Sequence, residues 1–425
     1  MKPSVLTVFE HQTVGIGEAS GDLSDDEASQ LLHVSKKRAG FCTPGYRSLR
    51  FAQFVGLVRA GERIVEILPK TGELPDRSLS RGTLLRMLRL ALDIPIHTNA
   101  GVGHDALDGT LLEIFITAYL DSLARLVKRG LSRRYRPAED DLQVVRGRLL
   151  LERQAGANAL RFDRVACRYD EFDIDHAWNQ VLKAALVATR PWIRGLGNSR
   201  RWLELNAAFD DVSLRRDMRR VSNSLVLDRN MAHYADGLRW AKWILRLLSP
   251  GLRAGTDDAP ELLFDMNTLF ESSVATCIRA RIGATTGRLA VQEGDQFLLR
   301  AEDESSQRHL RLKPDLVIRV DGAVVAVADT KWVLPSIGVH GRFVPPASHV
   351  YQLHAYAARY PCKEFALIYP WHAQLEGKPA TGFLLPSVDG VTRRLRVIYV
   401  DVGEEGMPVR SRGSESIFDG FLVAA

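Results

Sequence analysis

Two aspartates and a lysine stand among apolar residues in "LKPDLVIRVDGAVVAVADTKW", residues 312–332. The stretch predicts two short strands around an Asp-Gly turn, and an unpaired charge buried in such a hairpin costs several kcal/mol. Asp315, Asp329 and Lys331 should therefore compensate one another or bind a ligand. A divalent metal ion between the two carboxylates, with the lysine beside it, could activate water and hydrolyse a phosphodiester.

The register of this hairpin decides whether the two carboxylates meet. Alternation along the second strand puts Asp329 and Lys331 on one face. With a strict two-residue turn, Asp315 falls opposite Ala328 and faces away from that pair. One extra residue, in a three-residue turn or in a bulge, brings Asp315 opposite Asp329 with Cβ atoms ~5 Å apart. We therefore expect an irregular hairpin, and a regular one with Asp315 facing away would count against the site.

Two predicted helices could complete the site. A helix over 265–282 carries Glu271 beside its apolar stripe, where it could make a cluster of three acids. A second helix, over 348–360, carries Gln352 and Tyr356 four residues apart on one face, within reach of a phosphate or of the lysine. Taken singly, these residues are more often solvated or in surface contacts, and the hairpin acids could equally sit at exposed strand ends with Lys331 in an ordinary salt bridge.

The remaining elements predict a multi-domain α/β protein. Residues 1–95 look strand-rich, and residues 96–250 predict a mainly helical middle domain. The Gly-, Pro- and Asp-rich segment 249–261 predicts a linker. In 251–425 the order of helix, strands, helix and strand indicates a mixed sheet flanked by helices.

Composition narrows the classes of function. A chain of 425 residues with 46% hydrophobic content can fill several cores, and no apolar stretch is long enough to span a membrane. The four cysteines lack zinc-ligand spacing, which is typical of single thiols in a reducing cytoplasm. The net charge of +6 permits a polyanionic partner, although so modest an excess is weak evidence for one. There is no GxxxxGK[ST] motif, so any P-loop motor must be another polypeptide.

The acidic hairpin and its neighbours resemble the PD-(D/E)xK nuclease superfamily: Pro314-Asp315 is followed by Asp329-Thr330-Lys331. That motif is short, and longer stretches make a second resemblance more specific. They resemble McrC, the nuclease subunit of the modified-cytosine restriction system McrBC, in order over roughly residues 49–402. The stretches are "FVGLVRAGERIVEILPK", "RRYRPAEDDLQVVRGRL", "CRYDEFDIDHAWNQVLKAAL", "MNTLFE", "YQLHAYAARY" and "LIYP". Residues 1–45, the segment 338–348 and the C-terminal tail match nothing in that family.

This resemblance implies a Mg²⁺-dependent endonuclease subunit, with Mn²⁺ as a substitute, that cuts double-stranded DNA together with a McrB-like hexameric AAA+ GTPase. In the family, the N-terminal part inserts into the motor ring and stimulates GTP hydrolysis, which implies that residues 1–95 dock to the partner. The alternative is a regulatory subunit that activates a motor ring and retains the nuclease fold only as a binding module. Its motivation is the large portion, 1–250, outside the nuclease motif.

The resemblance also implies roles for individual residues. The residue at 329 is Asp where many superfamily members have Glu, and the family allows both. Lys331 would be the catalytic lysine and Gln352 an active-site helper. The implied metal ligands are Asp315, Asp329, Glu271 and the backbone carbonyl of Thr330.

Overall fold

The computed structural model packs into two compact units. The first comprises the described residues of Met1–Ser4 and Gly109–Leu262, and the second combines those of Val5–Asp108 and Leu263–Ala425. Strands β1 (Ser4–Phe9) and β10 (Glu261–Asp265), which begin in the first unit, are described with the second, because it holds most of their residues. The described residues of the predicted segments 1–95 and 251–425 thus belong mainly to one unit. The predicted domain boundaries near 95 and 250, and most of the predicted linker at 249–261, lie outside the described residues and stay predictions. The structure describes residues 4–19, 21–72, 76–94, 109–215, 217–226, 229–248, 261–282, 287–302, 307–335, 343–376, 382–386, 390–404 and 407–409.

The first unit is a group of helices with a long ribbon made mainly of two strands. Thr110 and Glu113 form a capping box at the start of its longest described helix, α3, and Gly130 ends it. The helices are α3 (Leu111–Arg129), α4 (Leu151–Ala155), α5 (Ala177–Thr189), α6 (Leu196–Ala208), α7 (Met218–Ser224) and α8 (Ala235–Leu248).

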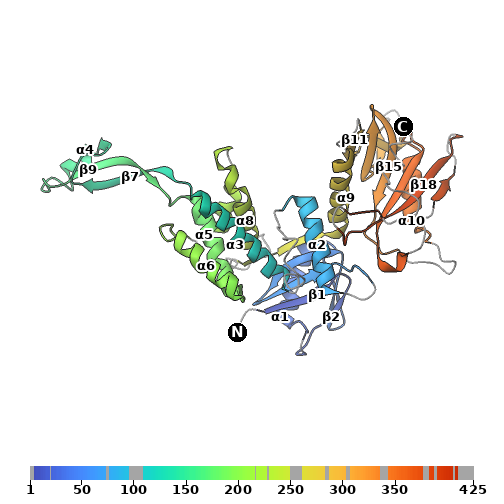
Figure 1. Cartoon of the computed structure of the whole chain (residues 1–425), viewed down its shortest axis with the longest axis horizontal. Helices are drawn as coiled ribbons and strands as arrows, with labels where there is room; N and C mark the ends of the chain where they lie inside the picture. The colour runs from blue at the N-terminus through green and yellow to red at the C-terminus, as the bar shows by residue number, and fades with distance from the viewer. Residues whose placement is uncertain are drawn as a thin grey trace. The chain divides into compact units, whose positions relative to one another are not determined.

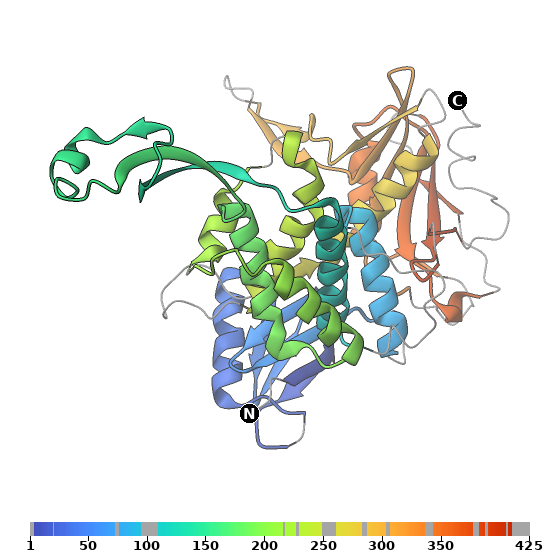
Figure 2. The ribbon, with the colours of Figure 1, turned by 60° about the vertical axis from the view of Figure 1, so that its left-hand side comes forward.

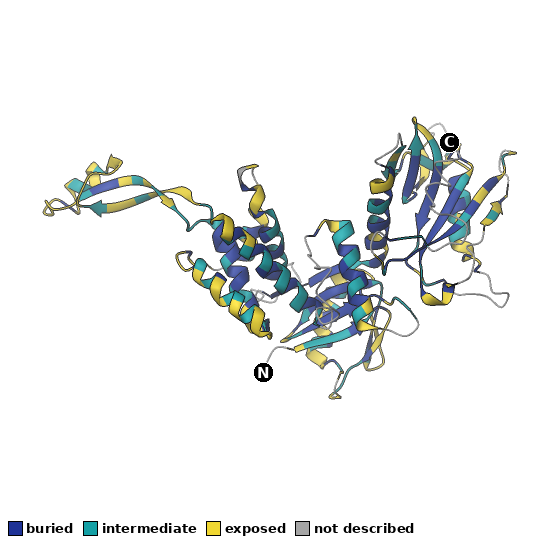
Figure 3. Cartoon of the chain, in the orientation of Figure 1, coloured by how far each residue is buried: buried dark blue, intermediate teal, exposed yellow. Residues whose placement is uncertain are grey.

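Strands β7 (Arg134–Leu142) and β9 (Val165–Asp173) pair antiparallel along their whole length, and β8 (Arg148–Leu149) pairs with β9. Figure 2 shows this ribbon projecting from the helices of its unit. Most of β7 is exposed (Figure 3). Beyond the strands, the side chains of Leu160 and Phe162 are 90% and 92% exposed. No sequence pattern indicated this ribbon, because its strands carry charges where a packed strand carries apolar residues.

The N-terminal part of the second unit is strand-rich, as predicted. Strands β5 and β6 form a hairpin around Ala60-Gly61, with Ala60 paired to Arg63 and Gly61 at a φ of 60°. One sheet has the order β1-β6-β5-β10 and another the order β2-β4-β3. The elements are β1 (Ser4–Phe9), β2 (Thr13–Gly15), α1 (Asp25–Lys37), β3 (Cys42–Gly45), β4 (Ser48–Phe51), β5 (Phe54–Ala60), β6 (Arg63–Leu68), α2 (Arg77–Leu92) and β10 (Glu261–Asp265).

The C-terminal part of this unit is a mixed sheet of six strands in the order β11-β14-β15-β16-β18-β17. Figure 1 labels its strands β11, β15 and β18. Pairing is antiparallel between β14 and β15 and parallel from β15 to β16 and from β16 to β18. The elements are α9 (Met266–Ile282), β11 (Gly287–Val291), β12 (Gln296–Arg300), β13 (Arg308–Leu312), β14 (Leu316–Val320), β15 (Ala323–Thr330), α10 (Ala347–Ala357), β16 (Glu364–Pro370), β17 (Gly382–Leu385) and β18 (Arg393–Val400).

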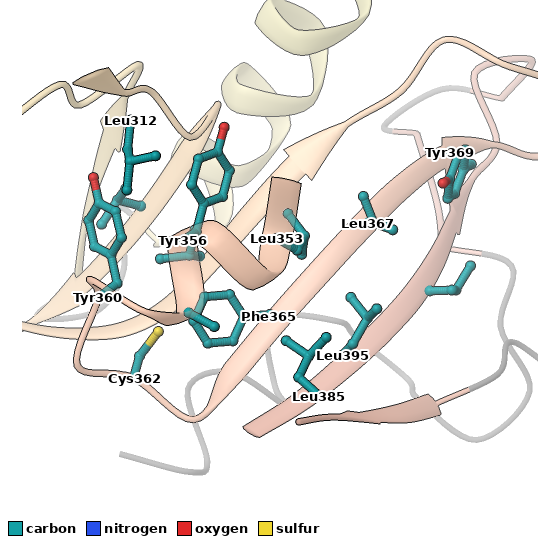
Figure 4. Packing of buried hydrophobic residues seen from close by; sticks show 14 of the residues in the cluster. Leu312, Leu353, Tyr356, Tyr360, Cys362, Phe365, Leu367, Tyr369, Leu385 and Leu395 are labelled. Carbon is teal, nitrogen blue, oxygen red and sulfur yellow. The ribbon is translucent and has the colours of Figure 1, made fainter. Parts of the chain in front are cut away.

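Helix α10 packs on one face of this sheet. Figure 4 shows Leu353 and Tyr356 of the helix in one buried cluster with Phe365, Leu367 and Leu395 of the strands. The alternate residues of β15 and β16 are buried as well, so the central strands are apolar on both faces, which is typical of parallel pairing. No described helix is both long and apolar enough to cross a membrane.

The two ends of the second unit are joined by contacts next to the acidic hairpin. The indole Nε1 of Trp332, one residue beyond Lys331, donates to Glu10 Oε1 at 2.9 Å. The ring of Trp332 also packs against Phe270 of α9, with centroids 5.4 Å apart. The N-terminal strands therefore support the end of β15 directly.

Candidate active site

The hairpin β14–β15 contains the irregularity that the carboxylates require. Its turn has two residues, Asp321 and Gly322, both in the left-handed region at φ of 49° and 84°. The register then shifts between Ile318 and Arg319, so that Val325 is an extra residue on β15. The predicted extra residue is confirmed, and it is a bulge rather than a longer turn.

The bulge places Asp315 beside the end of β15. Leu316 pairs with Ala328, so the preceding residue, Asp315, stands at the position opposite Asp329. The backbone N and the Oγ1 of Thr330 both donate to Asp315 Oδ2 at 2.7 Å, which fixes this carboxylate on the strand end. Asp315 Oδ1 has no hydrogen-bond partner among the described residues. Because the N–H and C=O of a strand residue point to the same edge, the Thr330 carbonyl faces the Asp315 side as well.

Asp329 is a fully buried carboxylate with a cation against it. Its Oδ2 lies 2.5 Å from Lys331 Nζ, and its Oδ1 accepts from Gln352 Nε2 at 3.2 Å. Burial, and then the charge of Asp315, raise the pKa of Asp329 to about 6, although Lys331 opposes both effects. A divalent cation between the two carboxylates would stabilise the ionised form of Asp329, because its positive charge would offset their repulsion.

Helix α10 holds the lysine. Lys331 Nζ donates to Gln352 Oε1 at 2.9 Å, and Gln352 Nε2 donates to the hydroxyl of Tyr356 at 2.7 Å. The same hydroxyl donates to the carbonyl of Lys313 at 3.1 Å, just before Asp315. The predicted pair on one helical face therefore meets both the lysine and the approach to the first carboxylate. An amide that holds a lysine while bonding to a buried carboxylate fixes the ammonium in one orientation.

Glu271 lies near this group without joining its hydrogen bonds. It is 8% exposed on α9 and accepts from Gln292 Nε2 at 3.2 Å. Burial, and then the charges of Asp315 and Asp329, raise the pKa of Glu271 to about 7. Within the described ranges no group of three or more Asp, Glu, His or Cys side chains converges as a metal cluster. The role of Glu271 as a metal ligand stays a prediction.

The donor set fits Mg²⁺. It consists of oxygens only: the free Oδ1 of Asp315, the buried carboxylate of Asp329 and the carbonyl of Thr330. Mg²⁺ prefers oxygen ligands, keeps several waters and is usually held by one or two carboxylates. The arrangement can therefore bring a hydrated cation and an ammonium to one phosphate.

Two residues of this site were missed in the sequence. His349 Nδ1 lies 2.8 Å from the Tyr369 hydroxyl, and the pKa of His349 is lowered by burial and by the charge of Lys331. It lies three residues before Gln352, so helical spacing could have found it. Gln292 sits outside any helix or strand at a φ of 50°, and its N–H donates to the Asp315 carbonyl at 3.0 Å. No sequence signal marks such a loop residue.

Comparisons with known proteins agree with one another. The family model described as "McrBC 5-methylcytosine restriction system component" matches residues 49–370. Among solved structures, the chain is similar to one in a refined half-complex from a tetradecameric assembly of Thermococcus gammatolerans McrB AAA+ hexamers with bound McrC. That similarity has a TM-score of 0.72 and 18% identity over 98% of both chains, and it shows the fold.

A second similar structure is a cryo-EM structure of the Thermococcus gammatolerans McrBC complex. The TM-score is 0.49 at 19% identity, over 66% of this chain and 88% of that one. No curated protein matches the chain.

Proposed function

This chain belongs to the McrBC 5-methylcytosine restriction system component family, and we propose on that premise that it is the DNA-cutting subunit of such a system. The reaction is the Mg²⁺-dependent hydrolysis of phosphodiesters in double-stranded DNA. The observation that carries the proposal is the meeting of Asp315, Asp329 and Lys331 at one end of β15, achieved by the bulge in that strand. A hairpin without a function would gain nothing from two adjacent acids there.

The residues divide the chemistry between them. Bound Mg²⁺ would supply a water of lowered pKa and polarise the scissile phosphate. Asp315 and Asp329 would hold the cation, with the Thr330 carbonyl as a third oxygen. Lys331, whose side chain is 21% exposed, can turn its remaining N–H groups to a phosphate oxygen or to the attacking water, while Gln352 fixes its position.

A AAA+ GTPase hexamer is the proposed partner. The similar solved structure contains McrB AAA+ hexamers with bound McrC, and this sequence lacks a P-loop of its own. The chain would therefore cut DNA in the cytoplasm as part of a complex with a separate motor. Recognition of the modified site would belong to that partner.

The test uses the full-length chain, the AAA+ protein encoded beside it, Mg²⁺, GTP and methylated duplex DNA. We expect cutting by the wild-type protein and none by Lys331→Ala, with both chains assembling equally on a sizing column. Lys363→Ala is the matched control, because Lys363 is an exposed lysine of the same sheet region whose side chain bonds to nothing described. Undiminished cutting by Lys331→Ala would show that Lys331 is not the catalytic lysine and that the proposed site is wrong.

The second candidate function, activation of a motor ring, is supported by the ribbon of the first unit. Its exposed Leu160 and Phe162 are large apolar side chains of the kind found at interaction sites. The docking role predicted for residues 1–95 stays a prediction, and deleting them is a poor test, because Glu10 bonds to Trp332 beside the nuclease site. The double variant Leu160→Ser with Phe162→Ser is a better test, because both side chains are exposed. Loss of GTPase stimulation would support ring activation by the ribbon, and unchanged stimulation would argue against that role of the ribbon.

A further inference from the structure

The hairpin of β12 and β13 leads directly to the first carboxylate of the proposed site and carries basic side chains that have no partner among the described residues. Every residue of β13 except Leu312 is exposed. The side chains of Arg300, His309 and Lys313 make no hydrogen bond or ion pair within the described parts of the chain. Among the described residues, the guanidinium of Arg308 contacts only the ring of Phe297, whose centroid lies 5.9 Å from its Cζ.

The pairing register of this hairpin is a second indication that an anionic ligand binds beside it. Arg300 of β12 pairs directly with Arg308 of β13. Like charges directly opposite each other in an antiparallel pair are destabilising, and each of these arginines lacks a carboxylate partner within the described residues. Such a pair is tolerated at lower cost when a polyanion lies beside it.

The base of the hairpin is fixed to the catalytic residues. The Lys313 carbonyl accepts from the Tyr356 hydroxyl at 3.1 Å, and only Pro314 separates Lys313 from Asp315. On the other strand, Arg359 Nε donates to the Phe297 carbonyl at 2.6 Å. The cations of β13 therefore keep a set position relative to the acids.

The nearby acids that the structure describes do not pair with these side chains. Glu293 is paired with Arg319 at 2.5 Å, and the charge of Asp295 acts on that same arginine. The exposed Glu302 lies at the far end of the hairpin. Among the described residues, the hairpin is thus basic along β13 and has an acid at its far end.

We infer that β13 and Lys313 form a track for phosphates of the DNA strand beside the scissile bond, and that the contact ends before the acidic end of the hairpin. This inference rests on the proposed nuclease function and names how that site holds its substrate. Contacts from Arg and Lys to phosphates position a duplex without reading its sequence, which suits a subunit whose partner recognises the modified base.

The test measures the binding of the full-length chain to a labelled duplex at several salt concentrations by fluorescence anisotropy, in a Lys331→Ala background so that DNA is not cut. Each phosphate contact contributes about 0.9 to the slope of log K against log salt, so Arg308→Ala with Lys313→Ala should make the slope shallower by about 2. Arg308→Lys with Lys313→Arg, which keeps the charge, should retain the slope. Glu302→Gln at the acidic end and Lys37→Ala on α1 are controls that should leave it unchanged.

Three results would overturn the inference: the same slope in the double alanine variant, an equal effect from Lys37→Ala, or no duplex binding by the parent protein at low salt. The nuclease proposal fails separately, when the wild-type complex with GTP and Mg²⁺ leaves DNA uncut. Cutting that depends on Lys331, together with an unchanged slope, would refute the phosphate track alone.

Discussion

Glu10→Gln should change how stability depends on pH, because Glu10 is a buried acid beside the proposed nuclease site. Its side chain accepts from Trp332 Nε1 and from the backbone N of Lys70, while its Oε2 is buried without a partner in the described part of the chain. Burial raises the pKa of Glu10 from its ordinary value of 4.5 to about 7, and the bonds from Trp332 and Lys70 only partly oppose this. The folded protein therefore holds a proton on Glu10 in a pH range where the unfolded chain has lost it.

The sign and size follow from proton linkage. A raised folded pKa gives stability that is fully present below pH 4.5 and is lost as the pH rises through 7. At 1.36 kcal/mol per pH unit over the interval from 4.5 to 7, the loss is at most about 3 kcal/mol. Gln keeps an acceptor for Trp332 and cannot ionise, so the variant should lack this part of the decline.

Denaturant unfolding of wild type and Glu10→Gln at pH 5 and pH 8 measures the loss of stability that Glu10 causes. We expect the free energy of unfolding of the wild type to fall by up to about 3 kcal/mol more than that of the variant between these two values. Parallel declines in the two proteins would show that Glu10 does not cause this pH dependence, and a steeper decline in the variant would show that its effect has the opposite sign.

Three further outcomes concern the site. Gln352→Ala frees Lys331 from its positioning amide, so kcat for DNA cutting should fall by about 10- to 100-fold with unchanged assembly, and an unaltered kcat would contradict the role. Thr330→Val removes the hydroxyl that holds Asp315, so the Mg²⁺ concentration for half-maximal cutting should rise by roughly tenfold, whereas Thr330→Ser should restore it. Because the pKa of Asp329 is raised to about 6, cutting should decline as protons bind below that pH, and higher Mg²⁺ should move this limb to lower pH; a limb that ignores Mg²⁺ would argue against a metal at Asp329.

The local part of the site could be predicted from the sequence. Strand alternation put Asp329 and Lys331 on one face, and helical spacing put Gln352 and Tyr356 on another, and the structure brings these together. The need for one extra residue also followed from counting along the hairpin. That the extra residue would be a bulge could not be predicted. Val325 suits a regular strand as well as a bulge, and only the pairing with β14 distinguishes the two.

Long-range contacts could not be predicted. Glu10 and Trp332 bond across most of the chain, and neither residue carries a local pattern that names its partner. Gln292 reaches Asp315 from a loop whose left-handed φ is set by tertiary context. The β7–β9 ribbon could not be predicted from the sequence, because its exposed strands lack the apolar alternation that identifies a half-buried strand.

The decisive experiment measures the cutting of methylated duplex DNA by the full-length chain with its AAA+ partner, GTP and Mg²⁺, for wild type, Lys331→Ala and Lys363→Ala. We expect cutting by the wild type and by Lys363→Ala, and none by an equally assembled Lys331→Ala. Equal cutting by all three proteins would mean that Lys331 has no catalytic role and that the proposed site is wrong.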